Sequence, residues 1–304
     1  MTTKLKPTEK SSQTSPPIDY ATRDYLLACI DPQKRFSMRF LSLRNMVEQT
    51  LAQKKTTDSL SLFLAECLIG SVLLGSRTSE QESTLFKYIL TNPDMRVNCE
   101  VSPVGALRCA VFPAENRKLV LPEWLDGSLN VAVLNQEKEV YESIIEFSQS
   151  SAVEIFAEYT SMSYQTDCIM LLNGDVKDMT KNHGLLIERL PGTADEDWDD
   201  FQTRFADGER FVESFQNTSD PDQMMNYLFD RNFKVLKVLF PALTCSCSQE
   251  RFMKALELLP RQDLMELFIS NQGITSQCEY CQKVWEADDR QVRKLLGISK
   301  DVKH

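Results

Sequence analysis

Two close pairs of cysteines near the C-terminus have the residue type and the spacing of a metal site. One serine separates Cys245 from Cys247, Glu-Tyr separates Cys278 from Cys281, and thirty residues lie between the pairs. Two such pairs on tight turns can converge to place four thiolates in a tetrahedron, with metal–sulfur bonds of about 2.3 Å. Zinc prefers such soft ligands. We therefore expect one structural Zn²⁺ per chain, held by all four cysteines.

Thiolate chemistry would allow this site to respond to oxidants. Thiolates are the nucleophilic form of cysteine, so peroxide or hypochlorous acid can oxidise them, and each lost sulfur loosens the metal. The short spacing within each pair makes Cys245–Cys247 and Cys278–Cys281 disulfides accessible products. These properties permit a redox switch but do not require one, because many zinc sites are inert.

The remaining residues that could do chemistry offer no competing site. A CxxC pair can also be a thioredoxin-type redox motif, but that motif needs a βαβ context, which this region lacks. His183 is expected to be structural, and the only other histidine is the terminal His304. No P-loop, nucleophile elbow or HExxH motif is present, so we expect no enzyme. The other cysteines show no pairing pattern and are expected to be small buried hydrophobic residues: Cys29, Cys67, Cys99, Cys109 and Cys168.

Composition excludes several classes of partner. The chain has 304 residues, which favours two or three domains. A net charge of −10 argues against nucleic acid, because a nucleic-acid binder needs a basic surface. The longest apolar run, Ser61 to Gly75, is shorter than the ~20 residues of a membrane span and contains Glu66. We expect a buried core helix there, and no membrane partner.

The termini and the cysteine content suggest a location. Residues 1–18 are polar and rich in Pro, Ser and Thr, without the apolar region of a signal sequence, and are expected to form a disordered tail. Nine cysteines in a chain without an export signal indicate a reducing compartment. The expected location is the cytoplasm.

Residues 19–192 are expected to form a core domain of mixed helices and strands, so the fold class is α+β. Alternating apolar positions predict β-hairpins on either side of Ser102–Gly105 and of Asn135–Lys138. The strands lie too close together for regular βαβ units. The predicted strands are 36–42, 97–101, 107–111, 129–134, 140–147, 168–172 and 184–190, and the predicted helices are 22–30, 43–53, 60–74 and 153–159.

Residues 193–240 are expected to form an acidic helical linker. Between positions 194 and 222 there are ten acidic and two basic residues, which supply −8 of the net charge of −10. Thr193 and Glu196 fit a capping box at its start. The segment is either a solvated amphipathic helix or a marginally stable linker in which like charges repel. One helical face would carry Trp198, Phe201, Phe205, Val212 and Phe215.

Residues 241–304 are expected to form the zinc-binding domain. Helices are predicted from Gln249 to Leu259 and around Leu264–Phe268, with a strand at Val284 and a last helix capped by Asp288 or Asp289. About sixty residues provide little hydrophobic core. Metal binding contributes roughly 10–16 kcal/mol in such sites, so ligation and folding are expected to be one event.

In this context the two cysteine pairs resemble the 33 kDa chaperonin family, which are redox-regulated heat-shock holdases. The family signature is CxC, a long spacer and CxxC at the C-terminus, and here it reads CSC…CEYC. The flanking segments CSCSQERFMKALELLPRQDLMELF and CEYCQKVWEADDRQVRKLL are also similar. Upstream, GSLNVAVLN, YESIIEFSQSSAVEIFAEYTSMS and GLLIERLPG follow the order of the family's core segments. The resemblance covers about residues 20–300.

The resemblance implies a mechanism. Such a protein is inactive when reduced and zinc-bound, with Cys245, Cys247, Cys278 and Cys281 as ligands. Oxidation joins near neighbours as Cys245–Cys247 and Cys278–Cys281 disulfides, expels zinc and destabilises the linker. The exposed surface then binds unfolding client proteins without ATP, typically as a homodimer. The family's glycine-rich turn is replaced here by TNPDMRVN, residues 91–98, so we expect the turn to form through Asn92-Pro93-Asp94.

Two other functions fit the same residues. A constitutive zinc-stabilised interaction protein would behave alike in oxidant and reductant, and Cys245→Ser would only destabilise it. A thiol–disulfide oxidoreductase built on Cys278 and Cys281 would turn over in an insulin-reduction assay.

Overall fold

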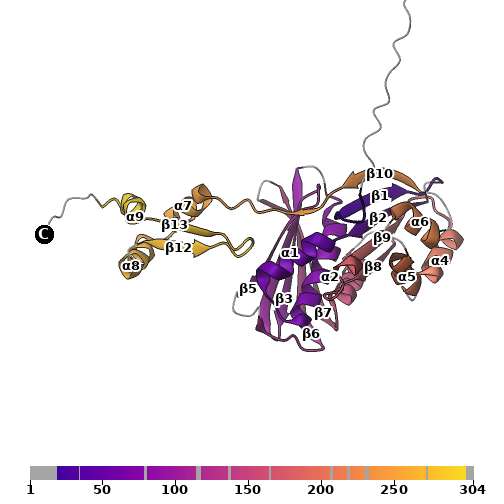
Figure 1. Ribbon diagram of the computed structural model, residues 1–304, viewed down its shortest axis with the longest axis horizontal. Coiled ribbons are helices and arrows are strands. Elements are labelled where there is room, and N and C mark those ends of the chain that lie inside the picture. The colour runs from indigo at the N-terminus through magenta and orange to yellow at the C-terminus, as the bar shows by residue number, and fades with distance from the viewer. Residues whose placement is uncertain are drawn as a thin grey trace, which may run out of the picture.

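The computed structural model describes residues 19–33, 35–78, 81–113, 118–135, 138–163, 166–205, 208–217, 220–229, 233–271 and 273–298. The tail predicted at residues 1–18 lies outside these ranges. The described chain forms a mixed α+β fold with two large sheets and a smaller C-terminal part (Figure 1).

The first sheet has the strand order β10-β1-β2-β9-β8, and all its pairings are antiparallel. Its strands are β1 (Tyr25–Ile30), β2 (Phe36–Ser42), β8 (Cys168–Asn173), β9 (His183–Arg189) and β10 (Lys234–Leu239). The prediction of a helix over residues 22–30 was wrong. β1 is buried on both faces, with Leu26 in one core and Leu27 in another, so its sequence lacks the alternation that identifies a strand.

The second sheet has the order β11-β5-β4-β3-β6-β7. Its strands are β3 (Glu82–Thr91), β4 (Asp94–Val101), β5 (Ala106–Phe112), β6 (Leu125–Asn135), β7 (Lys138–Gln149) and the short β11 (Ala242–Leu243). Both predicted hairpins, β4–β5 and β6–β7, are confirmed. Thr91 pairs with Asp94 across the β3–β4 turn, so Asn92 and Pro93 make that turn without a glycine.

Helix α2 (Asp58–Gly75) lies between the two sheets and contacts strands of both (Figure 1). The prediction of a buried core helix is confirmed, since most of its side chains are inaccessible to solvent. By length and composition α2 is also the single described helix apolar enough to cross a membrane, and 83% of it is buried inside the protein. Its helical neighbours are α1 (Arg44–Lys54) and α3 (Ala152–Ser163), and the short 3-10 helix η2 (Met179–Lys181) packs against α1.

The carboxyl group of Glu66 makes stability depend on pH. It lies within α2 and accepts a hydrogen bond of 3.0 Å from the Ala152 amide at the start of α3. Burial raises the pKa of Glu66 from 4.5 to about 7. Since the folded state binds this proton more tightly than the unfolded chain, the stabilisation is complete below pH 4.5 and is lost as pH rises through about 7.

We expect Glu66→Gln to remove this pH dependence, which amounts to about 3 kcal/mol. Urea unfolding at about pH 5 and about pH 8 would measure it, with the exposed Glu139→Gln as the matched control. Equal pH dependence in the wild type and in Glu66→Gln would contradict the assignment.

The acidic segment packs against the outer face of the first sheet as three helices, which we call the linker helices: α4 (Asp195–Arg204), α5 (Glu209–Asn217) and α6 (Pro221–Phe229). Trp198, Phe201 and Phe205 are buried against strands of this sheet, as the predicted apolar face required. The helix breaks near Gly208, whose φ of 68° lies in the left-handed region. The side chain of Phe215 lies outside the described residues. The segment also ends in a strand, β10, instead of remaining helical to residue 240.

The predicted capping box was wrong. Helix α4 begins after Ala194, with no side-chain cap. The buried Thr193 hydroxyl instead donates to the backbone carbonyls of Arg35, at 2.6 Å, and Leu190, at 2.8 Å. The Thr193 hydroxyl is therefore engaged in a hydrogen bond to the loop before β2 and does not cap the helix.

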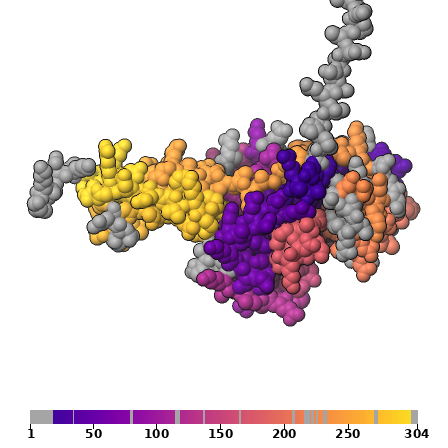
Figure 2. Space-filling model, viewed as in Figure 1, coloured from indigo at the N-terminus to yellow at the C-terminus, as the bar shows by residue number. Residues whose placement is uncertain are grey.

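The C-terminal part lies apart from the linker helices, beyond the far edge of the second sheet (Figures 1 and 2). It contains α7 (Gln249–Glu257), α8 (Arg261–Asn271), β12 (Ile274–Gln277), β13 (Val284–Ala287) and α9 (Asp289–Leu296). Asp288 caps α9 in a full capping box with Gln291, as predicted. Its core is small and is formed by Leu256, Leu264, Phe268, Ile274, Ala287, Val292 and Leu296.

Candidate metal centre

The second cysteine pair lies at the tip of the β12–β13 hairpin, in residues 278–283, which we call the knuckle. The Cys278 amide donates to the Lys283 carbonyl at 2.9 Å, and the Gln282 amide donates to the Cys278 carbonyl at 2.8 Å. Gln282 has a φ of 62°, in the left-handed region. These bonds close the chain tightly, so both thiols of the pair face the same point.

The first pair lies on an extended segment between β11 and α7. β11 pairs in parallel with β5, and the Thr244 amide donates to the Leu107 carbonyl at 2.8 Å. Cys245 comes directly after this anchored residue. Ser248 follows Cys247 and caps α7 by accepting from the Arg251 amide at 3.2 Å. The pair is therefore held between the second sheet and the first turn of α7.

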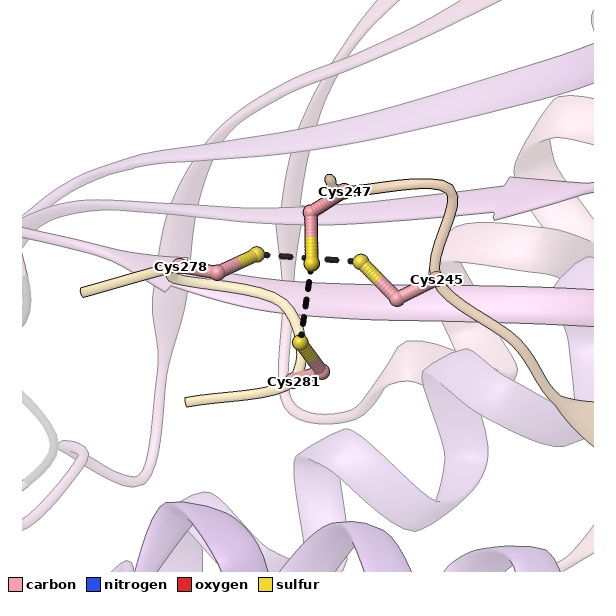
Figure 3. A group of neighbouring side chains, drawn as sticks. All are labelled: Cys245, Cys247, Cys278 and Cys281. Atoms are coloured by element: carbon pink, nitrogen blue, oxygen red, sulfur yellow. Dashed lines mark hydrogen bonds between the residues drawn. The ribbon is translucent and has the colours of Figure 1, made fainter. Parts of the chain in front are cut away.

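The four sulfur atoms lie within 4.8 Å of one another (Figure 3). The Sγ atoms of Cys245 and Cys278 are 3.7 Å apart, and those of Cys247 and Cys281 are 3.3 Å apart. A tetrahedron with bonds of about 2.3 Å has edges of about 3.8 Å. The cluster therefore has the size and the ligand type of a four-thiolate metal site. Both of these sulfur contacts join one pair to the other, so the two pairs meet at a single point.

The protonation of the site depends on whether a metal is bound. Burial raises the pKa of the Cys245 thiol to about 12 when no metal is bound, and hydrogen bonds among the clustered thiols add to the increase. Metal coordination favours the thiolate form instead, because ligation requires the proton to leave. The four cysteines together can thus hold a metal ion.

Two cations of the core reach the knuckle. Lys54, at the end of α1, is only 3% exposed, and its ammonium donates to the carbonyls of Glu279, at 2.5 Å, and Tyr280, at 2.7 Å. The guanidinium of Arg108 on β5 lies 4.6 Å from the centre of the Tyr280 ring and also pairs with Glu100 at 2.6 Å. A tetrathiolate site carries a net charge of −2 with Zn²⁺, so these cations lie where they stabilise it.

The structure thus brings together all four cysteines singled out in the sequence, while their role as metal ligands stays a prediction. Sequence reasoning missed Lys54, Arg108 and Tyr280, because no local pattern links α1 and β5 with the knuckle. It also missed that Cys99 and Cys109 face each other across the β4–β5 hairpin. That pairing could have been read from the predicted hairpin, whose turn at Ser102–Gly105 sets the register.

Comparison with known proteins places this geometry in context. A family model described as Hsp33 protein matches residues 24–288. The curated 33 kDa chaperonin of Lactiplantibacillus plantarum is 22% identical over 290 residues, which is 91% of this chain and 98% of that protein. The 33 kDa chaperonin of Streptococcus pneumoniae (strain JJA) is 28% identical over 235 residues, covering 75% of this chain and 76% of that one.

The fold has a counterpart among solved structures. The crystal structure of the 33 kDa chaperonin from Thermotoga maritima superposes with a TM-score of 0.75 and 17% sequence identity. The match covers 90% of this chain and 98% of the other. At this identity the similarity establishes that the two chains share a fold.

Proposed function

The chain belongs to the Hsp33 family of chaperones, and from this premise we propose that it is an ATP-independent holdase controlled by the redox state of its four-cysteine cluster. It acts by binding unfolding client proteins and is not an enzyme. The observation that carries the proposal is the convergence of four thiols within 4.8 Å, directly after the strands that follow the linker helices.

In the reduced state one Zn²⁺ is held by Cys245, Cys247, Cys278 and Cys281. When bound, zinc keeps the four sulfurs as thiolates and ties the segment after β11 to the knuckle. The small core of residues 249–296 depends on this tie, because seven buried side chains alone give a domain of this size little stability. Lys54 and Arg108 then hold the closed knuckle against the second sheet.

Oxidation opens the site. Two thiols and one hydrogen peroxide give one disulfide and two waters, so two peroxides convert the cluster to the disulfides Cys245–Cys247 and Cys278–Cys281. Disulfide sulfurs are no longer thiolates, so the four cysteines would not hold a Zn²⁺ ion after oxidation. Once the sulfurs are joined within the pairs, no metal ties the knuckle to the segment after β11, so the two are free to separate.

The signal reaches the linker through the chain itself. β10 and β11 connect α6 directly to Cys245, and β10 is an edge strand of the first sheet. The linker helices carry the acidic run and are held mainly by their aromatic face, so they are the part most easily released. Their departure uncovers the apolar side chains of β1 and β2, which we propose as the client-binding surface.

The remaining properties follow the family. We place the protein in the cytoplasm, where thiols stay reduced until an oxidant arrives. The active, oxidised form is a homodimer. The domain division is a core at 19–192, a linker at 193–240 and a zinc-binding redox switch at 241–304, with neither nucleic acid nor membrane as partner.

The test measures zinc, thiols and client protection on the same samples. We expect peroxide with mild heat to release one zinc per chain and to oxidise the cluster, and the treated protein to suppress light scattering from a heat-denatured client. Cys168→Ser, which alters a half-buried cysteine outside the cluster, is the matched control and should behave as the wild type. Release of zinc without client protection would refute the chaperone mechanism. Equal protection in oxidant and reductant would favour the constitutive zinc-stabilised alternative.

A further inference from the structure

Three thiols are buried near the metal centre without belonging to it. Cys99 on β4 and Cys109 on β5 are 0% and 2% exposed, and Cys67 on α2 is also buried. Cys99 and Cys109 are direct partners in the antiparallel register of the hairpin. The Cys99 thiol donates to the Cys109 sulfur at 3.6 Å.

The backbone geometry suits a covalent bond between these two residues. Directly opposed residues of antiparallel strands have Cα atoms about 4.5–5.5 Å apart. Disulfides bridge Cα separations of about 4.4–6.8 Å. To bond, the two sulfurs need to approach from 3.6 Å to about 2.05 Å.

A cavity lies between Cys109 and the metal centre. Its volume is about 90 Å³, and it is lined by Cys109, Cys245, Cys281, Tyr280, Lys54 and Thr244, among others. A cavity needs about 10–15 Å³ in this measure to hold one water, so there is room for a small oxidant such as hydrogen peroxide. The knuckle forms one of its walls, and Cys109 forms part of another.

We propose that Cys99 and Cys109 are a third redox pair, which closes into a cross-strand disulfide when the knuckle leaves the second sheet. The opening step rests on the proposed function, whereas the capacity of the pair to oxidise rests on the hairpin alone. Cys109 loses its proton, the thiolate attacks hydrogen peroxide and the O–O bond breaks, and the departing hydroxide takes up that proton, which leaves a sulfenic acid and one water. Cys99 then loses its proton and attacks that sulfur, the S–O bond breaks, and the hydroxide that leaves takes up this second proton as a second water.

The closed protein protects the pair. The sulfur contact with Cys109 and burial raise the pKa of the Cys99 thiol well above its ordinary value, so Cys99 stays protonated and unreactive, and Cys109 is only 2% exposed. Removal of the knuckle exposes the Cys109 side of the hairpin to water. The core disulfide therefore records that the knuckle has left, and it does so without needing metal.

The test uses the full chain and peptide mass spectrometry. Protein is treated with peroxide, with or without a zinc chelator, then unfolded, alkylated and digested with trypsin. Cleavage after Arg96, Arg108 and Arg117 places Cys99 and Cys109 in separate peptides, 97–108 and 109–117. We expect a disulfide to join these two peptides, so that their combined mass is two hydrogens below the sum of the separate masses. The joined peptide should form earlier in the sample that contains the chelator. Wild type should then lose two more thiols than Cys109→Ala or Cys99→Ala, while Cys29→Ala serves as the buried-cysteine control.

Several outcomes would overturn the proposal. One is a disulfide that joins Cys109 to Cys67 or to Cys245 instead of Cys99. Another is alkylation of both Cys99 and Cys109 after the cluster is fully oxidised. A third is formation of the Cys99–Cys109 disulfide at the same rate with and without the chelator. Client protection is measured in parallel, so failure of the holdase function leaves the joined peptide as an independent result. If the oxidised protein protects clients while Cys99 and Cys109 are both still reduced, the proposed third redox pair is wrong and the holdase function is unaffected.

Discussion

Replacing Cys278 by serine is expected to abolish zinc binding and to unfold residues 249–296 while the two large sheets remain folded. A serine hydroxyl stays protonated and is a poor zinc ligand, so three thiolates remain. The core of this part contains seven buried side chains, and zinc contributes roughly 10–16 kcal/mol to domains of this kind. Loss of one ligand should therefore remove most of the stability of α7, α8 and α9.

Hydrogen exchange measures this result directly. Amides of α7 and α9 should lose protection in Cys278→Ser, whereas those of α2 should keep it, and the zinc content should fall from one equivalent to near zero. Cys168→Ser again provides the matched control. Retention of protection in α9 without metal would show that the small core is sufficient, and zinc would then be dispensable for this fold.

Phe201→Ala is expected to activate the chaperone without an oxidant. The ring of Phe201 lies 4.0 Å from that of Phe36 on β2 and 5.9 Å from that of Phe229 on α6, and the residue is 2% exposed. Truncation of a buried phenylalanine costs about 3–5 kcal/mol. These ring contacts join the linker helices to the first sheet. The lost packing energy should therefore weaken the attachment of the linker helices more than the sheet itself.

Suppression of client aggregation by the reduced, zinc-bound variant is the measurement. Phe156→Ala is the matched control, since Phe156 is equally buried but packs against Phe86 and Tyr88 in the other core. We expect it to lower the free energy of unfolding without activating the protein under reducing conditions. If Phe201→Ala lost stability but did not suppress client aggregation until it was oxidised, the face of the first sheet that the linker helices cover would not be the client-binding surface.

Local patterns predicted the parts of this fold whose contacts are local. Apolar and polar residues alternate along both strands of the β4–β5 and β6–β7 hairpins. The cap of α9 is local too, because Asp288 is followed three residues later by Gln291. The two cysteine pairs could be recognised because metal ligation imposes both residue type and spacing.

The errors arose where distant segments decide the outcome. Tyr25–Ile30 was predicted as a helix because a strand between two cores has no polar face to reveal its period. Thr193 fits a capping box, but the carbonyl of Arg35 from another element takes its hydroxyl. The contact of Lys54 with the Glu279 and Tyr280 carbonyls joins residues more than two hundred positions apart. No window of sequence contains both partners of such a contact.

The tryptophans give each part of the molecule its own fluorophore. The chain has three. Trp198 lies on α4 and is buried against the first sheet, Trp285 lies on β13 with the Lys283 ammonium 4.2 Å from its ring centre, and Trp124, just before β6, is exposed. Variants that keep one indole at a time would emit from a single part. Emission from Trp285 then follows the opening of the zinc-binding part, and emission from Trp198 follows release of the linker. The delay between the two emission changes measures the time between opening of the C-terminal part and release of the linker helices, which β10 and β11 connect.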